Sequence, residues 1–233
     1  FLGDSGDRAA VEHLMRGQAL EALVEDPPYG AKYTDTSGRH RPIIGDKAAS
    51  PEMLAPWLEH LSETGACYIF SRWKEEPAWR EWLEARLPLR NVIIWVKNVH
   101  GNGDLEAEYA PQYELVLFAA REEHQLYGKR LTDVWEFKKE TPDLHPTPKP
   151  VVLVRRCSEK STRPGDIVAD GCLGGGATLE AAELARRVCY GMELEPAYFA
   201  VCLERAFNMG LAPRRATTGE AAAPAPQIEE EET

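Results

Sequence analysis

The chain has 233 residues, which is enough to bury the core of one α/β domain but few for two. No apolar run approaches the roughly 18 residues that span a bilayer, so the sequence contains no membrane segment. The formal net charge of −11 argues against a protein that coats nucleic acid non-specifically, although it leaves room for a local basic face. The 5 cysteines are scattered without a C-x-x-C pair, which favours a reduced, cytoplasmic protein without disulfides or a zinc site.

Hydrophobic spacing predicts alternating helices and strands along the chain. The first half has a helix over 7–17, a strand ending at 26, a helix over 50–63, and strands over 66–71, 91–97 and 113–119 with a helix over 77–87 between them. The second half has helices over 150–162, 179–186 and 196–209, with strands over 166–170 and 188–192. This alternation is typical of an α/β fold with a mostly parallel sheet.

The chain ends are compositionally distinct from its body. From about Ala216 the sequence is rich in Ala, Pro and Glu, and we expect it to be disordered. The expected boundaries are a folded domain over 1–213 and an acidic tail over 214–233. Because the chain begins with Phe1 instead of Met, we also expect further residues upstream.

A rigid turn, Asp26-Pro27-Pro28-Tyr29, follows the first apolar strand. Its two prolines remove two backbone N–H donors, so the carbonyl oxygens of the turn are acceptors without competing donors. Open α/β sheets place their ligands at the carboxyl ends of strands, where this turn lies. We therefore predict that these four residues form the catalytic site, although a purely structural Asp-Pro-Pro turn is the alternative.

The turn suits an exocyclic amino group on a flat ring. The Asp26 carboxylate and the Pro27 carbonyl would each accept one of the amine hydrogens, while Tyr29 would stack on the ring. Such chemistry depends on positioning and electrostatics and needs no strong general base.

Two basic segments are candidates for nucleic-acid contact. Lys32, Arg39 and Arg41 lie in a polar, Gly-rich loop after the turn, where they would grip phosphates. Lys129 and Arg130 lie in an irregular segment that also contains aromatic residues. An ordinary solvated surface explains either segment equally well.

A glycine loop, residues 171–176, follows the strand that ends at Asp170. The dinucleotide pattern G-x-G-x-x-G fails because Leu179 stands at its last glycine, and the phosphate P-loop fails because Ala177 stands at its lysine. A nucleoside without phosphates remains, with Asp170 near a cationic amino-acid end and Glu193 on paired ribose hydroxyls. S-adenosylmethionine is such a ligand, and a merely structural glycine turn is the alternative.

These motifs together resemble the beta-class amino methyltransferases, which modify adenine N6 or cytosine N4 in DNA. The resemblance covers roughly residues 1–210, and its catalytic tetrapeptide precedes its cofactor loop, which is the permuted order of that class. The further matching segments are Gly3-Asp4, Ile94-Trp95-Val96-Lys97, His145-Pro146-Thr147-Pro148-Lys149-Pro150 and Tyr190-Gly191-Met192-Glu193.

The resemblance implies a Rossmann-like S-adenosylmethionine-dependent methyltransferase fold, with a sheet of seven mostly parallel strands and helices on both faces. It implies that Asp4 lies near the cofactor adenine, Thr147 and Lys149 near its methionine portion, and Glu193 on its ribose. The loop residues expected to contact the cofactor are Asp170, Cys172, Gly174, Gly176 and Thr178. A short target-recognition segment would fall within about 99–144.

The loop departs from the family pattern, which usually reads Asp-Pro-Phe-x-Gly-Ser-Gly. Gly171 replaces the proline, and Cys172 replaces a phenylalanine that packs against the cofactor. Losing a stiff residue and an aromatic contact costs on the order of 1–3 kcal/mol of binding, so we expect weaker cofactor affinity than in a typical relative.

The resulting hypothesis is an enzyme that transfers a methyl group from S-adenosylmethionine to a flipped-out adenine in DNA, without a metal. Asp at position 26 resembles the adenine-specific members more than the cytosine-specific ones. The alternatives are a cytosine-N4 or RNA-adenine methyltransferase and a catalytically weakened methyltransferase fold that only binds nucleic acid. DNA is the expected partner, with a second copy of the chain as a possible one.

Overall fold

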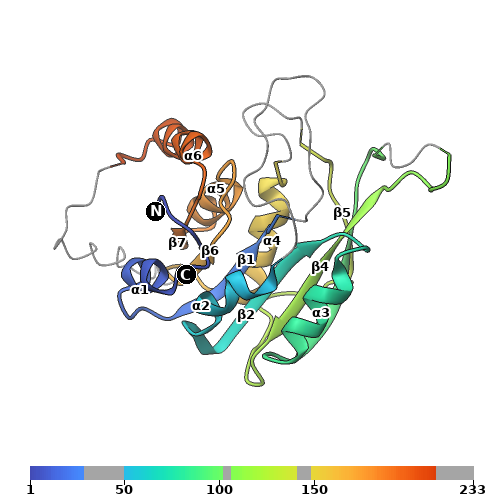
Figure 1. Ribbon diagram of the computed structural model, residues 1–233, viewed down its shortest axis with the longest axis horizontal. Helices are drawn as coiled ribbons and strands as arrows, with labels where there is room; N and C mark the ends of the chain where they lie inside the picture. Colours follow the sequence, from blue (N-terminus) through green and yellow to red (C-terminus); the bar gives the residue numbers. More distant parts are fainter. Residues whose placement is uncertain (29–49, 102–105, 141–147, 214–233) are drawn as a thin grey trace.

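The structure is a computed structural model, and it describes residues 1–28, 50–101, 106–140 and 148–213. Its centre is a seven-stranded sheet in the order β5-β3-β4-β2-β1-β6-β7 (Figure 1). The strands are β1 (Leu20–Glu25), β2 (Leu61–Ser71), β3 (Leu89–Val96), β4 (Tyr113–Ala120), β5 (Val134–Glu136), β6 (Ile167–Asp170) and β7 (Val188–Gly191). Of these strands, β4 alone runs antiparallel to its neighbours, so the predicted mostly parallel sheet is confirmed.

Helices cover both faces of the sheet. They are α1 (Arg8–Met15), η1 (Pro51–Leu54), α2 (Ala55–Leu58), α3 (Glu76–Glu84), α4 (Val151–Ser161), α5 (Ala177–Leu184) and α6 (Pro196–Asn208). Side chains alternate between the faces of a strand, so Leu23 of β1 packs under α1, α2 and α3, whereas Val24 packs under α4 and α5. Each face therefore has its own hydrophobic core.

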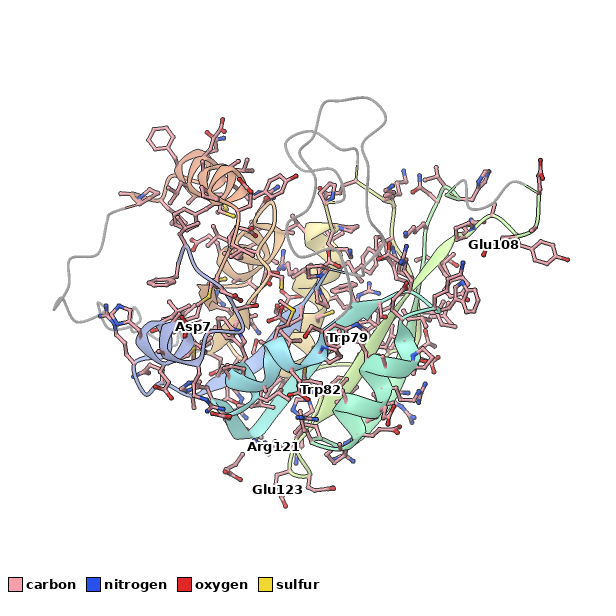
Figure 2. The ribbon with its side chains drawn as sticks, in the orientation of Figure 1. Asp7, Trp79, Trp82, Glu108, Arg121 and Glu123 are labelled. Carbon is pink, nitrogen blue, oxygen red and sulfur yellow. The ribbon has the colours of Figure 1, made fainter. Side chains whose placement is uncertain are left out.

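The first core contains two tryptophans from one helix. Trp79 and Trp82 extend from α3, which is amphipathic, and their rings meet edge to face with centroids 6.2 Å apart (Figure 2). Trp79 is fully buried and Trp82 is 7% exposed, and burying rings of this size contributes much of the packing energy. α3 is thereby fixed beneath β2, β3 and β4.

One predicted helix is shorter than expected. The hydrophobic spacing predicts a helix over 50–63, but η1 and α2 end at Leu58, and Leu61 already begins β2. Pro51 begins η1 and Pro56 lies in the first turn of α2, because proline suits a first turn but cannot continue a longer helix. The side chain of Ser62 donates a hydrogen bond to Glu21 on β1 (2.7 Å), so this stretch pairs with the sheet.

The parallel strands end at one common edge of the sheet. Glu25, Ser71, Val96, Asp170 and Gly191 are the last residues of their strands, and antiparallel β4 begins there at Tyr113. β1 lies between β2 and β6, with Ala22 opposite Val168 and Leu23 opposite Ala169. The predicted turn after β1 and the glycine loop after β6 are therefore neighbours.

Candidate active site

The Asp-Pro-Pro turn leaves the sheet directly after β1. Asp26 is the first residue beyond the strand, and its side chain is 25% exposed. Pro27 is buried and Pro28 is half-buried, so the start of the turn is held against the body of the domain. Tyr29 lies outside the described residues, as do Lys32, Arg39, Arg41 and Thr147.

Lys149 joins the turn to two other strands. Its Nζ lies 2.6 Å from Oδ2 of Asp26 and 3.4 Å from Oε2 of Glu114 at the start of β4. Lys97, just after β3, forms a further ion pair with Glu114. Lys149 is 7% exposed and its ammonium lies 5.4 Å from the ring centroid of Phe70. The predicted role of Lys149 beside the methionine portion of the cofactor stays a prediction, and in the structure its ammonium pairs with Asp26.

The charges in this cluster support one another. Burial by itself lowers the pKa of Lys149, but the charges of Asp26 and Glu114 and their hydrogen bonds leave that pKa raised overall. Burial likewise opposes ionisation of Glu114, but Lys149 and Lys97 leave the pKa of Glu114 lowered. A buried cation is thus held between two carboxylates. Glu114 was missed by the sequence analysis, and its only signal was an acid at the start of an apolar strand.

The glycine loop is held by the acids that flank it. Oδ1 of Asp170 accepts a hydrogen bond from the backbone N–H of Cys172 (2.8 Å). Oε2 of Glu193 accepts one from Gly174 N (2.7 Å), and Oε1 accepts one from Glu195 N (2.8 Å). Gly176 has a φ of 79°, a left-handed conformation that favours glycine, and it caps the start of α5. The loop is therefore preformed.

The N-terminal segment lies beside the same loop. Gly3 N donates to the carbonyl of Glu193 (2.9 Å), and the exposed Asp4 accepts a hydrogen bond from Gly6 N (2.9 Å). Sequence-predicted residues from both ends of the chain, Asp4 and Glu193, thus reach one edge of the sheet.

Three acids near the loop carry raised pKa values. Burial is the main cause for Asp170, whose pKa is raised to about 7 although hydrogen bonds from Thr178 and Cys172 oppose the rise. Burial also raises the pKa of Glu193. The third, Glu25, is wholly buried beside Asp170 and was not identified from the sequence, although a charged residue closing an apolar strand was visible there. Burial raises the pKa of the Cys172 thiol well above its usual range, which keeps this half-buried thiol protonated.

The residues present suit a nucleoside that carries a cationic amino acid. Glu193 uses one lone pair on each oxygen for backbone N–H groups, so further lone pairs remain to accept hydroxyl hydrogens. Asp170 supplies a second acidic acceptor at the next strand end. In the part of the chain that the structure describes, no group of His, Cys, Asp and Glu side chains is arranged to hold a metal ion.

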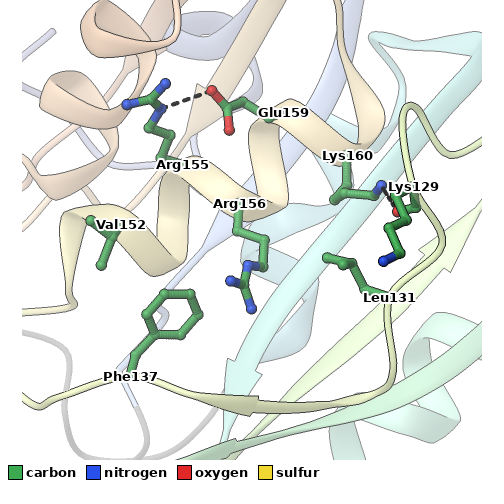
Figure 3. A pocket seen from close by; sticks show the side chains of 8 residues that line it. All are labelled: Lys129, Leu131, Phe137, Val152, Arg155, Arg156, Glu159 and Lys160. Carbon is green, nitrogen blue, oxygen red and sulfur yellow. Dashed lines mark hydrogen bonds and ion pairs between the residues drawn. The ribbon is translucent and has the colours of Figure 1, made fainter.

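A basic hollow of about 420 Å³ lies between α4 and the segment that leads through β5 (Figure 3). It is lined by Lys129, Leu131, Phe137, Val152, Arg155, Arg156, Glu159 and Lys160. Glu159, the one acid of the lining, pairs with Arg155 (2.8 Å). The guanidinium of Arg156 lies over the Phe137 ring, 4.3 Å from its centroid. The predicted nucleic-acid residue Lys129 is thus part of a basic, aromatic surface, and the adjacent Arg130 is exposed.

Comparison with known proteins decides the family. Residues 20–204 match the model of the N6/N4 DNA methylase family. The chain belongs to this family. Among curated relatives of this DNA methylase, YubD of Escherichia coli (strain K12), which is named as a methylase, is 28% identical over 218 residues, covering 89% of the chain and 93% of YubD. The type II methyltransferase M.BglII of Bacillus subtilis is 34% identical over 152 residues, covering 49% of the chain and 41% of M.BglII.

Solved structures show the same fold. The complex of M1.HpyAVI with S-adenosylmethionine superposes with a TM-score of 0.69 at 21% identity, covering 88% of this DNA methylase and 97% of M1.HpyAVI. The cytosine-N4-specific PvuII DNA methyltransferase gives a TM-score of 0.69 at 13% identity, covering 88% and 84% of the two chains. The predicted family and fold are confirmed, and the predicted cofactor agrees with these relatives. The relatives include the DNA adenine methyltransferase YhdJ of Escherichia coli (strain K12) as well as the cytosine-N4-specific PvuII enzyme, so both target bases occur among them.

None of the helices of this DNA methylase, within its described residues, is long and apolar enough to cross a membrane.

Proposed function

We propose that this DNA methylase transfers a methyl group from S-adenosylmethionine to the N6 amino group of adenine in DNA. The observation that carries the proposal is the adjacency of β1 and β6, which brings the Asp26 turn and the glycine loop to one edge of the sheet. An acceptor for an amine and a loop for a nucleoside then lie side by side at that edge. The folded domain over 1–213 would act as a single unit, with a target-recognition segment within 99–144.

In the proposed reaction the protein positions the amine. The Asp26 carboxylate and the Pro27 carbonyl accept the two amino hydrogens and turn the nitrogen lone pair toward the donor. Lys149 fixes the orientation of Asp26 through its 2.6 Å ion pair and is itself held by Glu114. When bound, S-adenosylmethionine would supply its sulfonium methyl group and leave as the thioether S-adenosylhomocysteine. The methylated nitrogen would then lose one of the two protons that Asp26 and Pro27 hold. The target base leaves the helical stack, because its amino group is out of reach inside a duplex, and Tyr29 stacks on it.

The basic hollow is proposed to contact the DNA backbone. β5 ends at the same sheet edge as β1, so the hollow runs from the catalytic edge along α4. The hollow gathers positive charge from Lys129, Arg156 and Lys160 on a chain whose formal net charge is −11. This local charge suits binding of the phosphate backbone at the hollow and not over the whole surface. Lys32, Arg39, Arg41 and Arg130 are proposed as further contacts.

The proposal is tested by supplying labelled S-adenosylmethionine and unmethylated DNA to the chain and identifying the methylated nucleoside by mass spectrometry. N6-methyladenine is the expected product. N4-methylcytosine, or methylation of RNA alone, would support the rival acceptors, and no transfer would support a binding module. Asp26→Ala should abolish transfer while cofactor binding persists, whereas Asp166→Ala, at the opposite end of β6, should retain transfer.

A further inference from the structure

Among the described residues, Glu25 is a buried acid without a cation. It is the last residue of β1, and its exposed fraction is 0%. Glutamate is almost never fully buried unless it is paired, yet no ion pair to Glu25 is found among the described residues. Burying such a group costs several kcal/mol unless a hydrogen bond compensates. A residue buried at this cost beside Asp26 is therefore expected to have a specific role.

The carboxyl group of Glu25 binds the cofactor loop. Its Oε1 accepts a hydrogen bond of 2.6 Å from the backbone N–H of Gly171, which directly follows Asp170. Oε2 is equally buried and has no conventional hydrogen-bond partner among the described residues. The weakly donating thiol of Cys172 faces the same group. One side chain therefore spans from the catalytic strand to the start of the loop.

Position 171 has no room for a larger residue. A Cβ atom on Gly171 would lie 2.8 Å from Nε1 of Trp57 and 3.0 Å from Cβ of Ser5. Trp57 is itself fixed, because its Nε1 donates to the carbonyl of Ser5 (3.2 Å). A proline here, as in the usual family pattern, would meet Trp57 and would also lack the N–H that Glu25 accepts.

We propose that Glu25 is a positioning residue that ties the cofactor loop to the catalytic turn, and that its hydrogen bond to Gly171 replaces the stiffness that proline supplies in the family pattern. Glu25 and Gly171 then form a matched pair: Gly171 supplies the N–H that the buried carboxyl group accepts, and Glu25 restrains the loop at a residue that lacks the stiffness of proline. This inference rests on the proposed function in one respect, namely that the loop holds the cofactor. It removes one of the two reasons for expecting weak cofactor binding.

The surroundings of Glu25 favour its neutral form. The groups that face it are Asp170 on β6, Asp26 directly after β1, the Cys172 thiol in the loop and the Cys67 thiol on β2. Burial and the negative charge of Asp170 raise the pKa of Glu25 well above its usual range. A neutral carboxyl group still offers a carbonyl oxygen to Gly171 N. Glutamine has the same shape and also offers a carbonyl oxygen, so Glu25→Gln should preserve this hydrogen bond.

The test is calorimetric titration of the full chain with S-adenosylmethionine, with folding checked by circular dichroism. Glu25→Ala should weaken binding by about tenfold, the effect of one lost buried hydrogen bond, whereas Glu25→Gln should stay within about threefold. Glu21→Ala, on the same strand but bonded to Ser62 and Thr64 at the surface, is the matched control and should bind as the native chain does. A folded Glu25→Ala variant with native affinity, or a glutamine variant as weak as the alanine one, would overturn the proposal.

Two further measurements separate positioning from general destabilisation. Glu25→Ala should raise KM for S-adenosylmethionine more than it lowers kcat. Gly171→Pro should weaken binding, and adding Glu25→Ala to it should cost little more, because both remove the same bond. Additive losses would contradict the pairing.

A chain that binds S-adenosylmethionine but methylates no DNA would refute only the proposed function, whereas a native chain that binds none would refute both.

Discussion

Lys149 lies 2.6 Å from the carboxylate of Asp26 and is almost completely buried, although the two residues belong to opposite halves of the chain. This ion pair connects the catalytic turn after β1 to the segment that leads into α4. Without this contact the Asp26 carboxylate would sample several orientations, whereas the buried ammonium of Lys149 holds it in one.

Replacing Lys149 should impair both stability and catalysis. Lys149→Met leaves Asp26 without its ammonium and removes one cation from Glu114, and breaking a buried pair in this way costs about 3 kcal/mol or more. We expect kcat to fall by more than tenfold in the folded fraction, with denaturant melts reporting the lost stability. Lys74→Met removes an exposed pair with Glu108 and should cost under about 1 kcal/mol. Equal losses in the two variants would refute the special role of Lys149.

Glu114 should make the domain sensitive to acid. The pKa of Glu114 is lowered in the folded state, so its stabilising effect is complete above the ordinary carboxyl range near pH 4.5. That effect is lost as the pH falls through the lowered folded pKa. The native chain should therefore lose more stability between about pH 5 and pH 3 than Glu114→Gln does, as measured by Tm. Parallel curves for the two proteins would contradict this.

Glu25 should make the domain less stable as the pH rises, which is the opposite of the effect of Glu114. Its pKa is raised in the folded state, so the folded chain retains a proton that the unfolded chain loses, and stability falls as the pH rises from about 4.5 toward the raised value. Asp170, with a pKa of about 7, adds a loss of the same sign. The Tm of Glu25→Gln relative to the native chain should thus rise with pH between 5 and 8. A constant difference would show that Glu25 is not neutral, and Glu21→Gln is the control.

The basic hollow should contribute a salt-dependent part of DNA binding. Removing one phosphate contact lowers affinity and reduces the salt slope by about one, so Lys129→Ala should weaken binding several-fold at low salt and less at high salt. Arg156→Ala should do the same, with some loss of stability because its guanidinium packs on Phe137. Lys74→Ala, on an exposed residue outside the hollow, should leave the slope unchanged. Fluorescence anisotropy at several salt concentrations measures both quantities.

The sequence by itself determined the alternation of strands and helices, the Asp-Pro-Pro turn and the glycine loop. These features are local: hydrophobic periodicity, proline geometry and glycine spacing act over a few neighbouring residues. The family resemblance followed from the order of these motifs. Local signals gave the wrong prediction at Leu61. Its hydrophobic spacing predicts a helix, but the residue pairs with Leu20 of β1 and belongs to β2.

Tertiary structure alone decided which charged residues face one another. No periodicity links Lys149 to Asp26 and Glu114, or Glu25 to Gly171, because these contacts form only when β1, β4 and β6 meet at one edge of the sheet. Burial then sets the protonation of these acids, and burial is a property of the packed domain. The short β5 strand and the hollow beside it likewise depend on pairing with β3, which the irregular sequence around Trp135 did not reveal.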